Sequence, residues 1–256
     1  MTTKPRPFQP TLSVITVVYN NAADIERTIR SVLSQTYPRI EYLIIDGGST
    51  DGTVEIVHRF KEHIAVFVSE PDKGIYDAMN KGLARATGDY VLFMNSGDEL
   101  YDAATVAEVF ETSPDGDIYY GETELFDEQW RSLGLRRHRV PDQFSWRSFR
   151  YGMNVGHQAI YVRRSIAPSY DPRYKLSADV DWVIRAAKKS RKVVNVRRIV
   201  AKYLVGGMSR KRHKQSLIER FVILSRHYGW LPNLFNHGVI ALRFATYFLR
   251  HGKPRA

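Results

Sequence analysis

The sequence predicts an α/β fold in which a mainly parallel central sheet is flanked by helices. Two observations support this prediction. The first hundred of the 256 residues alternate short, β-branched apolar runs with longer segments whose apolar residues recur at helical spacing. Each apolar run then stops abruptly at residues that form turns or carry charge, as strands do at the edge of such a sheet. No repeat or long linker interrupts this pattern, which favours one domain over two.

Four strands and three helices are expected in the first half of the chain. The first helix carries Ile25, Ile29 and Val32 on one face, and Thr53 is expected to cap the second. The expected strands are residues 12–19, 42–45, 64–69 and 90–94, and the expected helices are residues 23–35, 53–61 and 74–86. Strands that alternate with helices are joined by crossovers and therefore run parallel.

The second half is less regular. Its expected elements are strands in residues 116–126 (with a turn), 156–165 and 193–200, a helix over 176–190, a mobile basic loop over 206–215, and helices near 216–228 and 231–250.

Charge also divides the chain into two halves. Residues 1–127 contain 10 Lys and Arg against 21 Asp and Glu, whereas residues 128–256 contain 28 against 6. This asymmetry indicates either an anionic partner for the second half (nucleic acid, a membrane surface or a phosphorylated substrate) or a solvated basic face. The absence of cysteine excludes disulfides, thiolate nucleophiles and thiolate metal sites. No segment has the apolar run expected of a signal peptide or a transmembrane helix.

Three loops follow apolar strands, and ligands of such sheets bind beyond the carboxyl ends of the strands. The loops are Tyr19-Asn20, Asp46–Asp51 and Asn95–Glu99. In the second loop, Asp46 stands beside two glycines that let a ligand approach closely, so its carboxylate can face a ribose hydroxyl or a base N–H. The alternative is a turn that uses Asp and Gly for geometry alone.

The third loop contains a candidate metal ligand. Mg²⁺ and Mn²⁺ prefer carboxylate oxygen and often share ligands with substrate phosphates. Gly97 lifts Asp98 from the strand end, which makes Asp98 the candidate, while Asn95 can bond a nucleotide or a metal-bound water. The alternative is that Asp98 only prepares the helix expected to start near Asp102.

A third candidate lies in "SADVDW", residues 177–182. A carboxylate near an acceptor hydroxyl can take its proton as a bond forms. Asp179 and Asp181 are two positions apart, so they project about 200° apart on a helix and cannot both face one site. Asp179 lies nearer the helix N-terminus, where the macrodipole favours the anion. The alternative is one capping and one exposed Asp.

Together these segments resemble the family 2 glycosyltransferases, which have the GT-A fold. The resemblance lies in "LSVITVVYNNAADIERTIRSVLSQTYPRIEYLIIDGGSTDGT", "DKGIYDAMNKGLARATGDYVLFMNSGDELYD", "GHQAIYVRRS" and "SADVDWVIRA", and covers roughly residues 11–210. The motifs "DKGIYDAMNKG" and "MNSGD" are most similar to those of the colanic-acid-type exopolysaccharide transferases.

The resemblance implies transfer of a sugar from a nucleotide-diphosphate donor, with a divalent metal bridging the phosphates. Tyr19 then matches the residue that packs on the donor base, and Asp46 matches the carboxylate that binds base or ribose. Lys73 lies by the loop that contacts the donor, with Asp77 a further candidate. Asn95 lies at the donor as well.

The metal and the catalytic base follow from the same resemblance. The Asp-x-Asp element of the family stands here as Asn95-Ser96-Gly97-Asp98, and its last carboxylate is kept as Asp98. Asp179 matches the catalytic base of inverting enzymes, in which an acceptor hydroxyl attacks C1 as the diphosphate leaves. Ala178 replaces the Glu that often precedes this base.

Residues outside these motifs provide further candidates. His157 is expected either to contact the acceptor or to be a packed residue without a role in binding. The loop "GGMSRKRHK" can close over the donor, so that Arg210, Arg212 or His213 meets phosphate. The helix over 231–250 has a wide apolar side with basic edges, which suits an anionic membrane surface, the protein's own core or a dimer partner.

These considerations give the expected organisation. Residues 1–215 form the GT-A domain, with a nucleotide-binding part at about 11–127 and an acceptor-side part at about 128–215, and residues 216–256 form a basic amphipathic helical extension. We expect a cytoplasmic enzyme, peripheral on the inner membrane face, that uses a glycan or lipid-linked acceptor in surface polysaccharide biosynthesis. The alternatives are an inactive relative and a basic nucleic-acid-binding protein, although no nucleic-acid motif accompanies the basic half and no nucleic-acid partner is expected.

Overall fold

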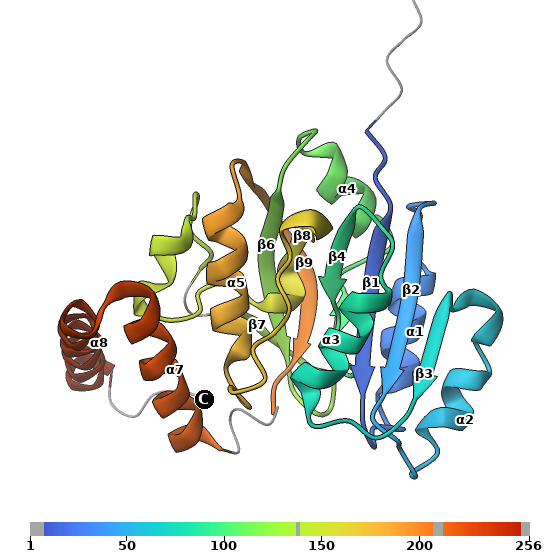
Figure 1. Cartoon of the computed structure of the whole chain (residues 1–256), viewed down its shortest axis with the longest axis horizontal. Helices are drawn as coiled ribbons and strands as arrows, with labels where there is room; N and C mark the ends of the chain where they lie inside the picture. Colours follow the sequence, from blue (N-terminus) through green and yellow to red (C-terminus); the bar gives the residue numbers. More distant parts are fainter. Residues whose placement is uncertain (1–7, 137–138, 207–211, 252–256) are drawn as a thin grey trace, which may run out of the picture.

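The structure is a computed structural model that describes residues 8–136, 139–206 and 212–251 (Figure 1). A single mixed sheet runs through these residues. Its strand order is β3-β2-β1-β4-β8-β6-β9-β5, and β7 pairs with β6 beside this path. The strands are β1 (Leu12–Val18), β2 (Ile40–Asp46), β3 (Val66–Ser69), β4 (Tyr90–Phe93), β5 (Glu99–Leu100), β6 (Ile118–Phe126), β7 (Ser132–Leu135), β8 (Ile160–Arg163) and β9 (Val193–Leu204).

Helices cover both faces of this sheet (Figure 1). The α-helices are α1 (Ile25–Leu33), α2 (Thr53–His58), α3 (Ile75–Arg85), α4 (Thr105–Glu111), α5 (Ala178–Lys189), α7 (His213–Tyr228) and α8 (Trp230–His251). Short 3₁₀ helices are η1 (Lys61–His63), η2 (Trp146–Tyr151), η3 (His157–Ala159) and η4 (Arg164–Ile166). The expected cap at Thr53 is wrong: α2 begins at Thr53 itself, after Gly52, and the Thr53 hydroxyl donates to Asp51 instead.

The first four strands confirm the predicted parallel crossovers. β1 pairs in parallel with β2 and with β4, and β2 pairs in parallel with β3. All seven residues of β1 are buried, because a strand with helices on both faces exposes neither side to water. The carboxyl ends of β1, β2 and β4 therefore meet at one edge of the sheet.

The rest of the sheet is mixed. β8 runs antiparallel to both β4 and β6, whereas β6 and β9 are parallel, with register shifts near Glu122. The turn expected within residues 116–126 is wrong, because β6 is continuous from Ile118 to Phe126. Gly121 serves another purpose: a Cβ there would lie 2.6 Å from the carbonyl oxygen of Arg198, so the glycine permits a close approach of β9.

The apolar core forms two layers, one on each face of the sheet. Alternate residues of β1 supply both layers: Ile15 and Val17 belong to one, Leu12 and Val14 to the other. The first layer lies under α3, α5 and the inner face of α7, and the second lies under α1, α2 and α4. The predicted α/β fold with C-terminal helices is thus confirmed.

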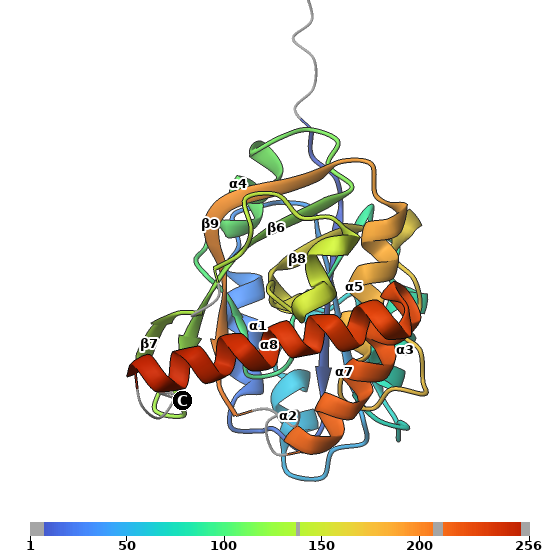
Figure 2. The same cartoon turned by 90° about the vertical axis from the view of Figure 1, so that its left-hand side faces the viewer.

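The two C-terminal helices lie at one end of the molecule, and α8 crosses α7 there (Figure 2). The side chain of Asn233 joins them by donating to the Phe221 carbonyl oxygen (3.0 Å) and to the Ser225 hydroxyl (2.8 Å). Within the described chain, every helix is too short or too polar to cross a bilayer.

Helix α3 packs unusually close to β1, and a glycine permits the contact. A Cβ on Gly82 would lie only 2.4 Å from Cγ2 of Ile15, which is β-branched and fully buried. Ile15 has little freedom to move, because its χ1 is restricted and its strand is hydrogen-bonded on both sides.

Replacing Gly82 by Ala is therefore expected to destabilise the fold by about 1–3 kcal/mol through overpacking, although Ala favours helices. The matched control is Gly238→Ala in α8, where an added Cβ would meet nothing within 4 Å. This control should stabilise the protein slightly, by about 0.5–1 kcal/mol. Urea unfolding of the three proteins measures both effects, and a Gly82→Ala protein as stable as Gly238→Ala would contradict the close packing.

Candidate active site

The loops that follow β1, β2 and β4 are bonded to one another. The Asn20 N–H donates to the Ser49 hydroxyl (2.7 Å), and the Thr50 N–H donates to the Asn20 side chain (2.9 Å). The Asn21 amide donates to the Ser96 hydroxyl (2.9 Å). All three predicted loops thus form one surface at the carboxyl edge of the parallel strands, as the rule for such sheets requires.

Asp46 is fully buried at the end of β2, and its carboxylate organises the loop that follows. One oxygen accepts from the N–H groups of Gly48 (3.0 Å) and Ser49 (2.9 Å) and from the Ser69 hydroxyl (2.6 Å). The other oxygen accepts from the Ser49 hydroxyl. Its observed role is structural, and binding of a base or ribose by Asp46 stays a prediction.

A second carboxylate lies beside this loop. A Cβ added to Gly47 would be 2.5 Å from Oδ2 of Asp72 and 3.3 Å from the ring of Tyr19. The backbone of Gly47 therefore lies against both Asp72 and an aromatic ring that is 64% exposed. An exposed ring next to a carboxylate suits the stacking and hydrogen bonding of a nucleobase. Sequence reasoning found Tyr19 but missed Asp72.

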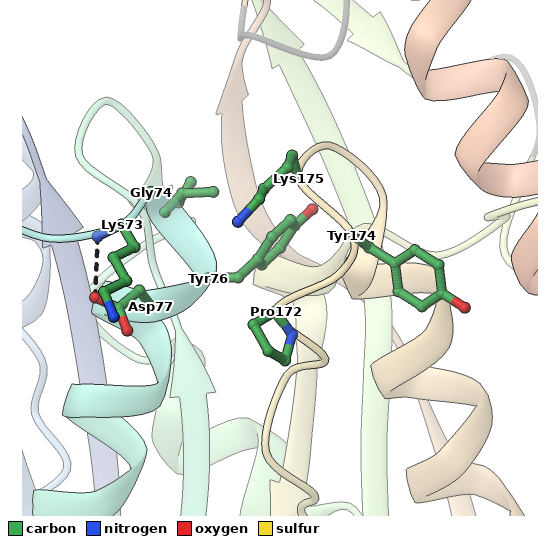
Figure 3. Close-up of a pocket in the computed structure, with 8 residues that line it drawn as sticks. Lys73, Gly74, Tyr76, Asp77, Pro172, Tyr174 and Lys175 are labelled. Carbon is green, nitrogen blue, oxygen red and sulfur yellow. Dashed lines mark hydrogen bonds between the residues drawn. The ribbon is translucent and has the colours of Figure 1, made fainter.

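Lys73 and Asp77 lie on the wall of a small pocket between the N-terminus of α3 and the loop before α5. Figure 3 shows Tyr76 between Pro172 and Lys175 in this pocket. The Asp77 carboxylate accepts from the Lys73 N–H (3.0 Å) and lies 3.7 Å from the Lys81 ammonium, so it is already paired. The Lys73 side chain is exposed, which leaves it able to meet an anion.

Asp98 is buried after the turn at Gly97, which has a φ of 102°. Within the described chain its side chain accepts one hydrogen bond, from the Leu204 N–H to Oδ1 (3.1 Å). Burial raises the pKa of Asp98 well above its usual range, and the Leu204 N–H opposes this only in part. A cation beside the free oxygen would stabilise the charged form.

The residues present fit a weakly coordinated divalent cation. The described residues contain no group of three or more His, Asp or Glu side chains that could enclose a metal ion. Mg²⁺ is often bound by only one or two carboxylates together with substrate phosphates and water. Asp98 fits that mode with its second oxygen, and nearby Asn95 has a buried Oδ1 that no described residue bonds.

His157 lies opposite Asn95, since its Nε2 is 3.3 Å from the Asn95 Nδ2. Burial lowers the pKa of His157, although the Asp179 carboxylate opposes this shift, so the imidazole is neutral near pH 7. The structure thus brings the predicted residues Asn95, His157 and Asp179 into one region.

Asp179 and Asp181 have different environments, as the helical spacing predicts. The Tyr76 hydroxyl donates to Oδ1 of Asp179 (3.3 Å). Burial first, and then Asp179, raise the pKa of Tyr76 well above its usual value, so the phenol keeps its proton. Asp181 instead forms an ion pair with Arg185 (2.6 Å) through one oxygen and a hydrogen bond with Nε2 of His227 (2.8 Å) through the other. Both of its oxygens are therefore engaged within the protein.

Two residues of this region escaped the sequence analysis. Tyr76 belongs to the quoted "DKGIYDAMNKG", yet it reads there as one more apolar residue of a helix. Arg136 follows β7, and its charge interacts with Asp179 and Glu122. Burial lowers the pKa of Arg136, which still leaves the group charged at neutral pH. The local sequence does not single out Arg136, because several other basic residues lie in the same segment.

The predicted basic loop is described only in part. Arg210 lies outside the described residues, as does the side chain of His213, whose backbone begins α7. Arg212 is exposed immediately before α7. Closure of this loop over a ligand stays a prediction.

Comparisons with known proteins agree with this geometry. Residues 13–167 match the family described as glycosyl transferase family 2. The chain is 31% identical over 229 residues to a PGL/p-HBAD biosynthesis glycosyltransferase of Mycobacterium bovis, which covers 85% of this chain and 86% of the relative.

Two solved structures are similar in fold. TarS residues 1–349 of S. aureus in complex with UDP superpose with a TM-score of 0.65 at 17% identity, over 84% of this chain and 64% of that chain. The mannosyltransferase PcManGT of Pyrobaculum calidifontis in complex with GDP-Man and Mn²⁺ gives a TM-score of 0.64 at 19% identity, over 96% of this chain and 77% of that one.

The fold is that of the GT-A glycosyltransferases. The chain belongs to glycosyl transferase family 2 and is a glycosyltransferase.

The hydrogen bonds of Asp46 generate a test. Asp46→Ala is expected to lower the free energy of unfolding by about 2–4 kcal/mol, because it leaves several buried donors unsatisfied. Asp72→Ala, at the same edge but only partly buried, should cost less than about 1 kcal/mol. Urea unfolding without nucleotide separates the two roles: an unchanged stability of Asp46→Ala would mean that Asp46 acts on ligand alone.

Proposed function

We propose that this glycosyltransferase is inverting and metal-dependent, and moves a sugar from a nucleotide-diphosphate donor to a hydroxyl of a glycan or lipid-linked acceptor. The observation that carries the proposal is that Asn95, His157 and Asp179 lie in one region, beside the turn that carries Asp98, whose N–H donates to the Asn95 carbonyl oxygen (3.0 Å). This region contains a carboxylate suited to a base and a neutral imidazole that faces Asn95 and interacts with Asp179, and the neighbouring turn contains a carboxylate suited to a cation.

The donor is proposed to lie across the loops after β1 and β2. The exposed ring of Tyr19 stacks on the base, and the Asp46 loop presents its backbone to base and ribose. Lys73 meets the diphosphate, and Asn95 bonds the donor beside it. The solved neighbours support a nucleotide-diphosphate donor, since one was obtained with UDP and another with GDP-Man.

Asp98 is proposed to hold the divalent cation together with the donor phosphates. When bound, Mg²⁺ or Mn²⁺ neutralises charge that develops on the leaving diphosphate. The Mn²⁺ in the mannosyltransferase complex supports this assignment. The chain's own contribution is the Leu204 N–H, which fixes one oxygen of Asp98 and leaves the other for the cation.

Asp179 is proposed to be the catalytic base. As the acceptor oxygen forms its bond to C1 of the sugar, its proton passes to Asp179, while the bond from C1 to the diphosphate oxygen breaks and its electron pair leaves with the nucleoside diphosphate. One displacement of this kind inverts C1. The Tyr76 hydroxyl, which keeps its proton, orients the Asp179 carboxylate.

The biological setting follows from the relatives and the surface. We propose a role in surface polysaccharide biosynthesis on the cytoplasmic side. The mycobacterial relative is likewise named as a biosynthetic glycosyltransferase. Membership of the colanic-acid-type subgroup stays a prediction.

The outer face of α7 and α8 is proposed to dock on an anionic membrane surface. Apolar side chains that point outward include Ile218, Leu231 and Phe235, which are 66%, 71% and 74% exposed. The inner side of α8 instead buries the polar Asn233 and Asn236. Glu219 is the one acidic residue of residues 212–251, so the outward apolar face lies within a basic region that suits anionic lipid.

A panel of UDP-, GDP- and dTDP-sugars tests the activity, with and without Mn²⁺. The right donor should raise the melting temperature, since it binds the native state, and should be hydrolysed slowly with release of nucleoside diphosphate. Asp98→Ala should abolish the Mn²⁺ dependence, and Asp179→Asn should lower turnover about 100-fold or more. Asp181→Asn, as a matched control, should lower stability instead. Equal turnover of Asp179→Asn and wild type would remove the base assignment.

Flotation with vesicles of anionic phospholipid tests the membrane surface. The double variant Leu231→Ser/Phe235→Ser should bind at least about tenfold more weakly, because each buried apolar side chain contributes about 1.5–3 kcal/mol. Leu133→Ser on β7 removes an exposed leucine elsewhere (54% exposed) and serves as control. Two results would argue against docking through the outer face of α7 and α8. One is equal binding of the double variant and the Leu133→Ser control, and the other is equal binding of wild type to anionic and neutral vesicles.

A further inference from the structure

Helix α7 contacts the segment that carries Asp179 more closely than an appended helix would. The loop before α5 and the first turn of α5 form hydrogen bonds with four side chains of α7: Ser216, Glu219, Arg226 and His227. This loop also supplies Pro172, Tyr174 and Lys175 to the pocket beside Tyr76.

Glu219 makes the most concentrated of these contacts. Its two carboxylate oxygens accept from the Lys175 N–H at 3.1 Å each. One of them also accepts from the N–H groups of Leu176 (2.8 Å) and Ser177 (3.1 Å). Three consecutive backbone donors therefore converge on one side chain, immediately before the first residue of α5.

These donors lie where the chain enters α5. Ser177 is the residue immediately before the helix, its N–H has no partner inside the helix, and it makes no side-chain cap there. A carboxylate at this end is also favoured by the helix dipole. Glu219 thus fixes, from α7, the backbone of residues 175–177 that leads into α5.

We propose that Glu219 is a positioning residue for glycosyl transfer: it fixes residues 175–177 and, through them, the direction of Asp179 two residues later. The inference rests on the proposed role of Asp179 as base. It does not require Glu219 to touch substrate, and it assigns α7 to the catalytic machinery rather than to the extension alone.

Other contacts hold α7 against α5 independently of Glu219. The hydroxyls of Ser177 and Ser216 lie 3.0 Å apart, and Arg226 donates to the Tyr174 hydroxyl (2.8 Å). His227 bonds Asp181 in the first turn of α5. These contacts keep α7 attached to α5 when Glu219 is replaced, so the expected consequence is a loosened first turn rather than a detached helix.

The experiment compares Glu219→Ala and Glu219→Gln with wild type, using release of nucleoside diphosphate from the donor that shifts the melting temperature most. Glu219→Ala is expected to lower kcat about 10- to 100-fold, as a misplacement of about 1 Å does, while KM for the donor changes less than about threefold. Glu219→Gln keeps one acceptor oxygen and should fall between. Hydrogen exchange of the amides of residues 175–177 should quicken in the same order.

Two controls separate positioning from general loss of stability. Val106→Ala removes buried methyl groups on α4, in the core layer on the opposite face of the sheet, and should reduce stability with kcat unchanged. In an Asp179→Asn background, Glu219→Ala should have little further effect on kcat, because it acts through the group already removed.

Three outcomes would overturn the proposal. One is a loss of kcat no greater than that of Val106→Ala, another is a KM that rises in step with the fall in kcat, and the third is a full additional loss in the Asp179→Asn background. Wild-type protein that hydrolyses none of the donors would instead defeat the proposed function. In that case hydrogen exchange of the amides of residues 175–177 would still test whether Glu219 fixes this segment. Exchange rates unchanged in both Glu219 variants would overturn that part of the proposal.

Discussion

The parallel pairing of β1 with β2 on one side and β4 on the other is the constraint on which the rest of this enzyme depends. Because the three strands run the same way, their carboxyl ends lie next to one another, and each ends in a polar loop. Residues separated by more than 70 positions, such as Asn21 and Ser96, then come within hydrogen-bonding distance. Crossover helices cover both faces of the sheet, which leaves this edge as the place where ligands can enter.

Much of this arrangement could be predicted from local patterns. The alternation of apolar strands and amphipathic helices predicted the first half of the fold, and the rule for strand ends selected all three loops. The spacing of Asp179 and Asp181 also predicted that only one could face the site. Each inference relies on interactions between residues close in sequence, or on a topology that follows directly from the order of the elements.

The remaining features depend on pairings that no local pattern encodes. The register of β6 against β9 pairs residues some 75 positions apart, and the turn expected within residues 116–126 is wrong because Gly121 instead permits the close approach of Arg198 on β9. The structural role of Asp46 likewise depends on Ser69, the last residue of another strand. Contacts between α7 and α5 cross the predicted boundary at residue 215, because an amphipathic pattern identifies a buried face but not its partner.

The hydrogen bond from Leu204 to Asp98 joins residues 106 positions apart and has a consequence for how the protein is made. Synthesis proceeds from the N-terminus, so the loops after β1, β2 and β4 leave the ribosome well before β9. During that interval the Asp98 carboxylate lacks the backbone partner that fixes one of its oxygens. Such long-range contacts also form late, since closing the intervening loop costs entropy. A nascent or prematurely terminated chain therefore cannot form this contact, which ties the proposed cation site at Asp98 to completion of the sheet.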